Sequence, residues 1–251
     1  MFRSALLAIC ILAGAASSAW STNITAMNEA ERDSFRAEIR EYLLSNPEVL
    51  MEAIGVLEER RAQNAAQNDL SLIADNREAI FNDGYSYVGG NPDGDITVVE
   101  FLDYQCSFCK RAFPVVEELI TSDGNIRIII KEFPILGDAS VMGSRYALAV
   151  KNLYGDDAYK NVHDEMMSLR GSLTPQTLVR VSEILDFDHD DIRAEMENED
   201  ITTIINENRA LAQTLQIQGT PTFVIGEVFA RGYLELDQMR AVIANERNRP
   251  G

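Results

Sequence analysis

The sequence is poor in the residues that mark several classes of protein. Its 251 residues include only 7 prolines, 15 glycines, 3 cysteines and 1 tryptophan, which excludes a collagen-like chain and a disulfide-rich scaffold. Basic residues are also scarce, because 22 Lys and Arg stand against 40 Asp and Glu, for a net charge of −18. Such an acidic chain lacks the positive field that attracts nucleic acid, so no nucleic-acid partner is expected. With 46% hydrophobic residues, the composition indicates a globular protein with a sizeable core.

A short apolar run occupies the N-terminus. The first residues read MFRSALLAICILAGAASSAW, in which Arg3 precedes the apolar run and small residues follow it. This order is typical of a secretory signal peptide, and the run is too short to span a membrane. We therefore predict a signal peptide at residues 1–19, cleaved before Trp20, with an uncleaved amphipathic N-terminus as the alternative.

That cleavage would leave two of the three cysteines in the mature protein. Cys10 would be removed, and Cys106 and Cys109 would remain, two residues apart, in an exported protein. A disulfide across so short a loop stabilises a fold little, so an inert disulfide is the weaker interpretation. Zinc needs about four N or S ligands, and neither His163 nor His189 has a ligand-like spacing to the pair. We expect neither a metal nor a cofactor.

The segment after the signal peptide is helical in composition. Apolar residues recur at helical spacing: Phe35, Ile39, Leu43, Leu50, Ile54 and Leu57. Asn46 and Pro47 suit the cap and first turn of a second helix. The stretch 60–69 offers only alanines to bury. We predict a helical stalk over residues 20–82 that forms a homo-oligomer through residues 28–80; the alternative is a helix pair packed on its own domain.

The rest of the chain alternates between strand and helix patterns. Residues 96–102 (ITVVEFL) and 126–133 (IRIIIKEF) read as strands, and the helical pattern between them contains Pro114. Strand, helix and strand within some forty residues predict a parallel strand pair. Four amphipathic helical segments then precede a second β-pattern. We predict an α/β domain over residues 83–251 with a helical insertion at about 138–216.

The cysteine pair lies at the junction of the first strand with its helix. Cys106 stands where the amide donors and the positive end of the helix dipole stabilise a thiolate, and Cys109 lies one turn further along. Cys106 is therefore the expected nucleophile. Cys109 would resolve the mixed disulfide that Cys106 forms.

Two segments together resemble a known family. VVEFLDYQCSFCK, with QGTPTFVIG more than 100 residues downstream, is similar to the DsbA-like thiol–disulfide oxidoreductases of the bacterial periplasm. The resemblance covers roughly residues 85–248. It implies a thioredoxin fold with a helical insertion, protein substrates that carry disulfides or thiols, a membrane redox partner and a periplasmic location.

The resemblance also implies roles for single residues. Glu100 matches the buried acid that assists proton transfer to and from the cysteines; a solvent-facing strand residue is its alternative. Thr220 and Pro221 match the cis-proline loop that binds substrate backbone, with an ordinary strand-entry proline as the alternative. Ser107 and Phe108, between the cysteines, would tune the redox chemistry, and no histidine stands there to hold the thiolate.

The combination of a helical stalk and such a domain resembles the ScsC-type oligomeric disulfide isomerases. Thr220 also resembles the residue of isomerases and reductases at this position. We therefore expect an exported protein disulfide isomerase or reductase. A monomeric DsbA-like oxidase, and a Cu(I)-handling or holdase module that uses the same cysteines, are the alternative functions.

Overall fold

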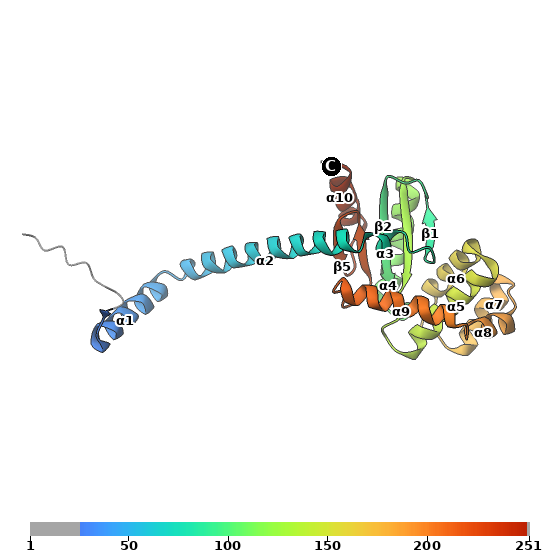
Figure 1. The fold of residues 1–251 in the computed structure, drawn as a ribbon, viewed down its shortest axis with the longest axis horizontal. Coiled ribbons are helices and arrows are strands. Elements are labelled where there is room, and N and C mark those ends of the chain that lie inside the picture. Colours follow the sequence, from blue (N-terminus) through green and yellow to red (C-terminus); the bar gives the residue numbers. More distant parts are fainter. Residues whose placement is uncertain (1–25, 250–251) are drawn as a thin grey trace, which may run out of the picture. The chain divides into compact units, whose positions relative to one another are not determined.

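The computed structural model describes residues 26–249, and the chain forms two units, residues 1–61 and 62–251 (Figure 1). The predicted signal peptide at residues 1–19 lies outside the described residues. None of the helices within the described range is long and apolar enough to cross a membrane.

Two helices begin the described chain. Helix α1 spans Glu29–Ser45 and helix α2 spans Glu48–Asp75. Asn28 opens α1 with a capping box, in which its side chain accepts from the Glu31 amide. Asn46 does not have the predicted capping role. Its side-chain amide donates to the carbonyl of Tyr42 at 2.8 Å, so it closes α1 instead of opening α2.

A five-stranded mixed sheet forms the centre of the second unit. Its strands are β1 (Tyr87–Gly90), β2 (Ile96–Leu102), β3 (Ile126–Glu132), β4 (Thr222–Ile225) and β5 (Val228–Arg231). They lie in the order β1-β3-β2-β4-β5. The β2–β3 pair is parallel, as predicted, and the other pairs are antiparallel. Strand β1 was not anticipated, because its two glycines and the turn residues around it resemble a loop.

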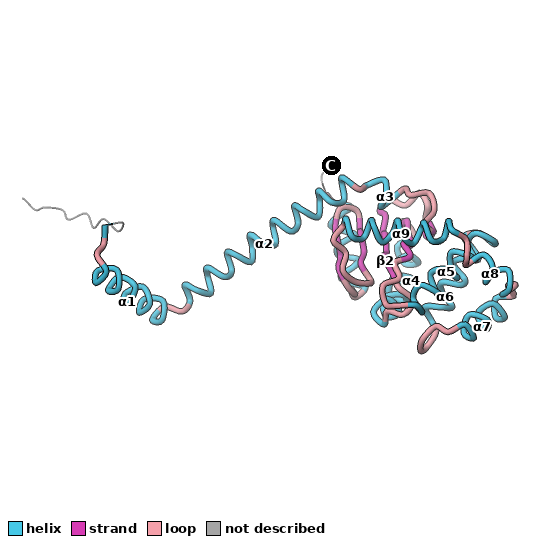
Figure 2. Tube along the Cα trace, turned by 60° about the horizontal axis from the view of Figure 1, so that its bottom comes forward, coloured by secondary structure: helices cyan, strands magenta, loops and turns pink. Residues whose placement is uncertain are grey.

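Three of the described helices that begin in this unit lie outside the insertion between β3 and β4, and five lie within it. Short α3 (Arg77–Phe81) follows α2, α4 (Ser107–Asp123) joins β2 to β3 and continues through Pro114, and α10 (Leu236–Arg247) ends the fold. The insertion between β3 and β4 contains α5 (Asp138–Tyr154), α6 (Asp156–Ser168), α7 (Pro175–Leu185), α8 (His189–Glu195) and α9 (Glu199–Thr214). Figure 2 shows α5–α8 gathered on one side of the strands, with α9 leading back to them.

The sheet carries an apolar core on each face, since side chains alternate along a strand. Val98 and Leu102 of β2 belong to the core that also contains the two cysteines. Val99 and Phe101 of the same strand belong to the other core. Glu100 is in phase with Val98 and Leu102, which turns its carboxyl to the cysteine side of the sheet.

The second core includes the end of α2. Ile73 of α2, and Ile80 and Phe81 of α3, are buried in it against β2 and β3. The compact unit that contains the sheet accordingly begins at residue 62, inside the segment predicted as a stalk. Burial of these apolar side chains joins residues 62–82 to the sheet.

Candidate active site

Cys106 stands at the N-cap of α4, directly after the turn that ends β2. Its backbone is extended (φ −73°, ψ 117°), and its amide donates to the carbonyl of Asp103 at 3.0 Å. Cys109, one helical turn later, is fully buried, whereas Cys106 keeps 7% of its surface exposed. Both cysteines are free thiols. The structure thus presents the reduced pair with one sulfur nearer the surface than the other.

The two thiols have opposite acidities. A hydrogen bond from the Cys109 thiol, the largest cause, lowers the pKa of Cys106 to about 5, and the side chain of Thr220 and the amides of Cys109 and Phe108 add to the decrease. Burial raises the pKa of Cys109 well above its usual range, and its hydrogen bond to Cys106 and the charge of Glu100 add to the increase. At neutral pH the pair therefore holds a Cys106 thiolate against a protonated Cys109.

The Thr220–Pro221 loop faces this thiolate. The peptide bond between the two residues is cis, and the Sγ of Cys106 lies 3.1 Å from the carbonyl oxygen of Thr220, to which the protonated thiol donates. The chain separates the two residues by 114 positions, so the fold alone brings them together. The loop that leads into β4 therefore places its backbone groups beside the nucleophile.

Glu100 lies under the cysteine pair in strand β2. Its side chain is 3% exposed, which excludes the solvent-facing alternative, and its Oε1 has no hydrogen-bond partner among the described residues. Burial, followed by the charges of Glu117, Cys106 and Glu132, raises the pKa of Glu100 to about 8. A carboxyl with that pKa exchanges protons in the range in which thiols react.

The residues between the cysteines have a different environment. The side chains of Ser107 and Phe108 are exposed, Phe108 by 55%. Only the amide of Phe108 acts on the Cys106 thiolate. The pair therefore acts on the thiolate through the backbone of Phe108, and its side chains face solvent.

Two buried carboxylates beside the site were missed in the sequence. Asp103 accepts from the amides of Gln105, Ile135 and Leu136 at 2.7, 2.8 and 3.0 Å, and so ties the turn before Cys106 to the loop after β3. Glu132 accepts from three hydroxyl groups: Tyr104 at 2.8 Å, Ser144 at 2.7 Å and Tyr159 at 2.6 Å. The one available signal was an acidic residue at the end of each apolar strand pattern.

Known proteins share both parts of this arrangement. Residues 97–244, more than half of the chain, match the family described as the DSBA-like thioredoxin domain. Residues 31–64 match the copper resistance protein ScsC N-terminal domain. The chain belongs to the DsbA-like thioredoxin family, a family of thiol–disulfide oxidoreductases. The predicted thioredoxin fold with a helical insertion and a preceding helical segment is confirmed.

Individual relatives match this chain over different shares of their own length. A Salinispora arenicola protein, Na(+)/H(+) antiporter NhaA 1, is 30% identical over 159 residues; the match covers 63% of this chain but only 24% of that protein. A thioredoxin-like oxidoreductase from Silicibacter pomeroyi is 35% identical with a TM-score of 0.66, covering 70% of this chain and 99% of its own. Proteus mirabilis ScsC in a transitional conformation is 27% identical with a TM-score of 0.63, and the match covers 88% of this chain and 98% of that chain.

Proposed function

We propose that the protein is an exported thiol–disulfide oxidoreductase that acts on protein disulfides in the periplasm, as an isomerase or reductase. The observation that carries the proposal is the asymmetry of the cysteine pair. An acidic Cys106 lies at a helix start, and a buried, protonated Cys109 lies behind it. This arrangement gives one nucleophilic thiolate and one protonated thiol that can resolve the mixed disulfide.

The proposed reaction begins at the Cys106 thiolate. It attacks one sulfur of a client disulfide, forms a mixed disulfide and releases the other client sulfur as a thiolate. In reduction, Cys109 loses its proton and attacks the Cys106 sulfur, so the client gains two electrons and the protein becomes a disulfide. In isomerisation, a client thiolate attacks instead, and the protein leaves the cycle reduced. A membrane redox partner would return the oxidised pair to the dithiol.

Glu100 would serve the second step. Cys109 must lose its proton before it attacks, and Glu100 lies close enough for its charge to raise the pKa of Cys109. With a pKa of about 8, Glu100 can take that proton and later return it. Thr220 and Pro221 would hold the client backbone beside Cys106.

We propose further that the first unit assembles the protein into a homo-oligomer. No side chain of α1 is buried. The exposed large apolar residues of α1 and α2 all fall within 35–57: Phe35, Ile39, Tyr42, Leu44, Leu50, Met51, Ile54, Val56 and Leu57. An exposed apolar surface of this kind marks an interface. Several active sites around one client would assist reshuffling of its disulfides.

Light scattering tests the assembly. The chain from residue 20 should be an oligomer, and deletion of residues 20–61 should leave a folded monomer that reduces disulfides but isomerises them poorly. Deletion through residue 81 is the informative contrast, because it also removes Ile73 and Ile80 from the second core and should lower stability. A monomeric full chain would contradict the proposed assembly.

Activity tests the chemistry. Cys106→Ala should abolish both insulin reduction and the refolding of scrambled ribonuclease. Cys109→Ala should keep the nucleophile and accumulate mixed disulfides. Activity retained by Cys106→Ala in either assay refutes the mechanism. Faster oxidation of reduced ribonuclease than rescue of the scrambled form would indicate a net oxidase, and tight Cu(I) binding without turnover would indicate a metal-handling role for the same thiols.

A further inference from the structure

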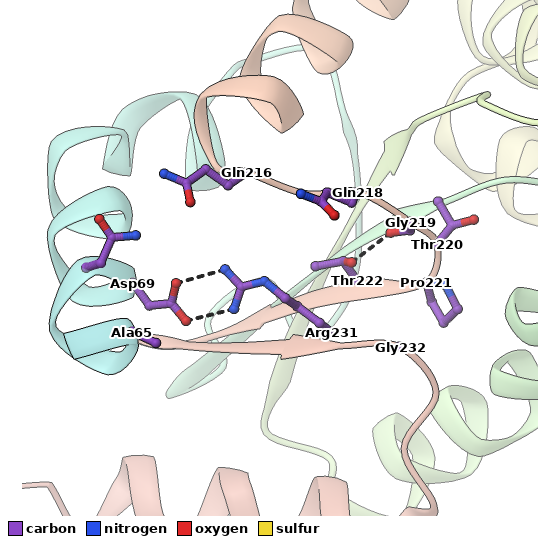
Figure 3. Close-up of a pocket in the computed structure, with 11 residues that line it drawn as sticks. Ala65, Asp69, Gln216, Gln218, Gly219, Thr220, Pro221, Thr222, Arg231 and Gly232 are labelled. Carbon is purple, nitrogen blue, oxygen red and sulfur yellow. Dashed lines mark hydrogen bonds and ion pairs between the residues drawn. The ribbon is translucent and has the colours of Figure 1, made fainter. Parts of the chain in front are cut away.

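A cavity of about 430 Å³ opens beside the Thr220–Pro221 loop (Figure 3). Its walls come from the second half of α2, from the segment that leads into β4, and from the end of β5. Figure 3 shows Asp69 and Ala65 projecting from α2 on one side, with Thr220 and Pro221 on the other. Its volume is in the range of ligand pockets, roughly 300–1,000 Å³.

Thr220 connects this cavity to the nucleophile. It lines the cavity, and its carbonyl oxygen lies 3.1 Å from the Sγ of Cys106. A client that places its disulfide on Cys106 and its backbone along Thr220 therefore has neighbouring residues beside the cavity, because an extended chain advances only about 3.3 Å per residue. This step rests on the function proposed above.

The charges in the cavity neutralise each other. Arg231 donates from both terminal nitrogens to the Asp69 carboxylate, at 2.7 and 2.8 Å. Such a forked pair has fixed geometry. Arg231 is also the ladder partner of Thr222, the residue after Pro221, so the ion pair joins α2 to the strand pair that carries the loop. A charged client side chain would have to compete with this pair.

Three side-chain amides of the cavity have no partner among the described residues. The side-chain amides of Asn68, Gln216 and Gln218 line it, and none of them forms a hydrogen bond with another described residue. Each amide offers both donors and an acceptor. By contrast, the Thr222 hydroxyl is already used, since it donates to the carbonyl of Gly219 at 2.8 Å. The cavity thus combines free neutral hydrogen-bonding groups with a satisfied ion pair.

We propose that this cavity is a specificity subsite for an uncharged, hydrogen-bonding side chain, Ser, Thr, Asn or Gln, close to the reacting cysteine of the client. The free amides supply the attraction. The Asp69–Arg231 pair excludes acidic and basic side chains, because each would leave one member of the pair without its partner.

Single-turnover reduction of disulfide peptides tests the proposal. The reduced chain from residue 20 is mixed with peptides that carry Asn, Glu, Lys or Leu at each of the two positions on either side of the cysteine, and the released thiol peptides are quantified. At one of these positions Asn should react about tenfold faster than the other three residues. Asp69→Asn, which leaves Arg231 unpaired, should shift the preference to Glu. Arg231→Gln should shift it to Lys.

Two further variants make the result decisive. The charge-exchanged variant Asp69→Arg with Arg231→Asp rebuilds the pair and should restore the preference for Asn. Arg247→Gln breaks surface ion pairs with Asp95 and Asp123, outside the cavity, and should keep the wild-type order of rates.

The outcomes separate the subsite from the proposed function. The same order of rates in all variants, or a wild-type preference for Leu, overturns the subsite while insulin reduction continues. If the wild type reduces neither insulin nor any peptide, the proposed function fails, and the subsite fails with it.

Discussion

Two buried carboxyl groups on neighbouring strands have opposite surroundings. Glu132, at the end of β3, accepts hydrogen bonds from three hydroxyl groups. Glu100, in β2, leaves its Oε1 without a partner among the residues of the described chain. Burial is the first cause of a raised pKa in both, to about 7 for Glu132 and about 8 for Glu100.

The difference separates a group that supports the fold from one that costs stability. The hydroxyls around Glu132 come from the turn before Cys106 and from helices α5 and α6, so this carboxyl links the site to the helical insertion. A buried polar atom without a partner destabilises a protein. Glu100 has this cost, and it lies where its charge acts on Cys109. That combination is typical of a functional group.

The largest effect on stability is expected from Glu132→Ala. Three buried hydroxyls lose their acceptor and a cavity forms, so the free energy of unfolding should fall by about 4 kcal/mol. Urea unfolding followed by circular dichroism measures the loss. Glu132→Gln is the matched control, since it keeps the volume and one acceptor and should lose much less. Equal losses in both variants would show that charge, not hydrogen bonding, is what Glu132 supplies.

Glu100→Leu should have the opposite effect on stability and should also slow the reaction. Removal of a buried, partly unsatisfied carboxyl should increase the free energy of unfolding by about 1–3 kcal/mol. The same change should slow resolution of the mixed disulfide by Cys109 about 100-fold, because the proton acceptor is lost. Stopped-flow reduction of a disulfide peptide resolves the two steps. Unchanged resolution in a folded Glu100→Leu protein would remove Glu100 from the mechanism.

The contribution of Glu100 to stability should depend on pH. Below its ordinary pKa of 4.5 the carboxyl is neutral in both folded and unfolded chains. As the pH rises from 4.5 to about 8, the unfolded chain ionises first and becomes favoured. The stability gained by Glu100→Leu over the wild type should therefore grow between pH 5 and pH 8 in urea titrations. Cys106 is present in both proteins, so its own titration largely cancels. A gain independent of pH would mean that Glu100 ionises normally.

The sequence predicts the residues of the active site better than the long-range contacts that hold them in place. The bounds of β2, its parallel pairing with β3 and the burial of Glu100 follow from continuous apolar runs. The position of Cys106 at a helix start follows from the change of pattern after β2. These features depend on local sequence, in which strand and helix periods are distinct.

Long-range pairs leave no such local signal. Asp69 and Arg231 are 162 residues apart, and only the fold shows that they meet. The hydroxyl partners of Glu132 likewise come from three separate elements. The seven-residue helix α8 was missed for a related reason, since it is too short to show an amphipathic period. The burial of Ile73 and Ile80 against the sheet is likewise a long-range contact that no local pattern shows.

The smallest predicted effect divides the Glu132 network. Tyr104→Phe removes one of its three donors and keeps the ring, so the free energy of unfolding should fall by about 1 kcal/mol. The neighbouring His163 also loses its contact with the Tyr104 hydroxyl, at 3.2 Å, but burial lowers its pKa to about 3, so it stays neutral. Because Tyr104 lies two residues before Cys106, ultraviolet titration of the thiolate is the second measurement. A thiolate midpoint unchanged from about 5 would assign the Glu132 network to stability alone. A raised midpoint would show that the network also positions the nucleophile. Glu132 and Glu100 would then both contribute to the chemistry, by different amounts.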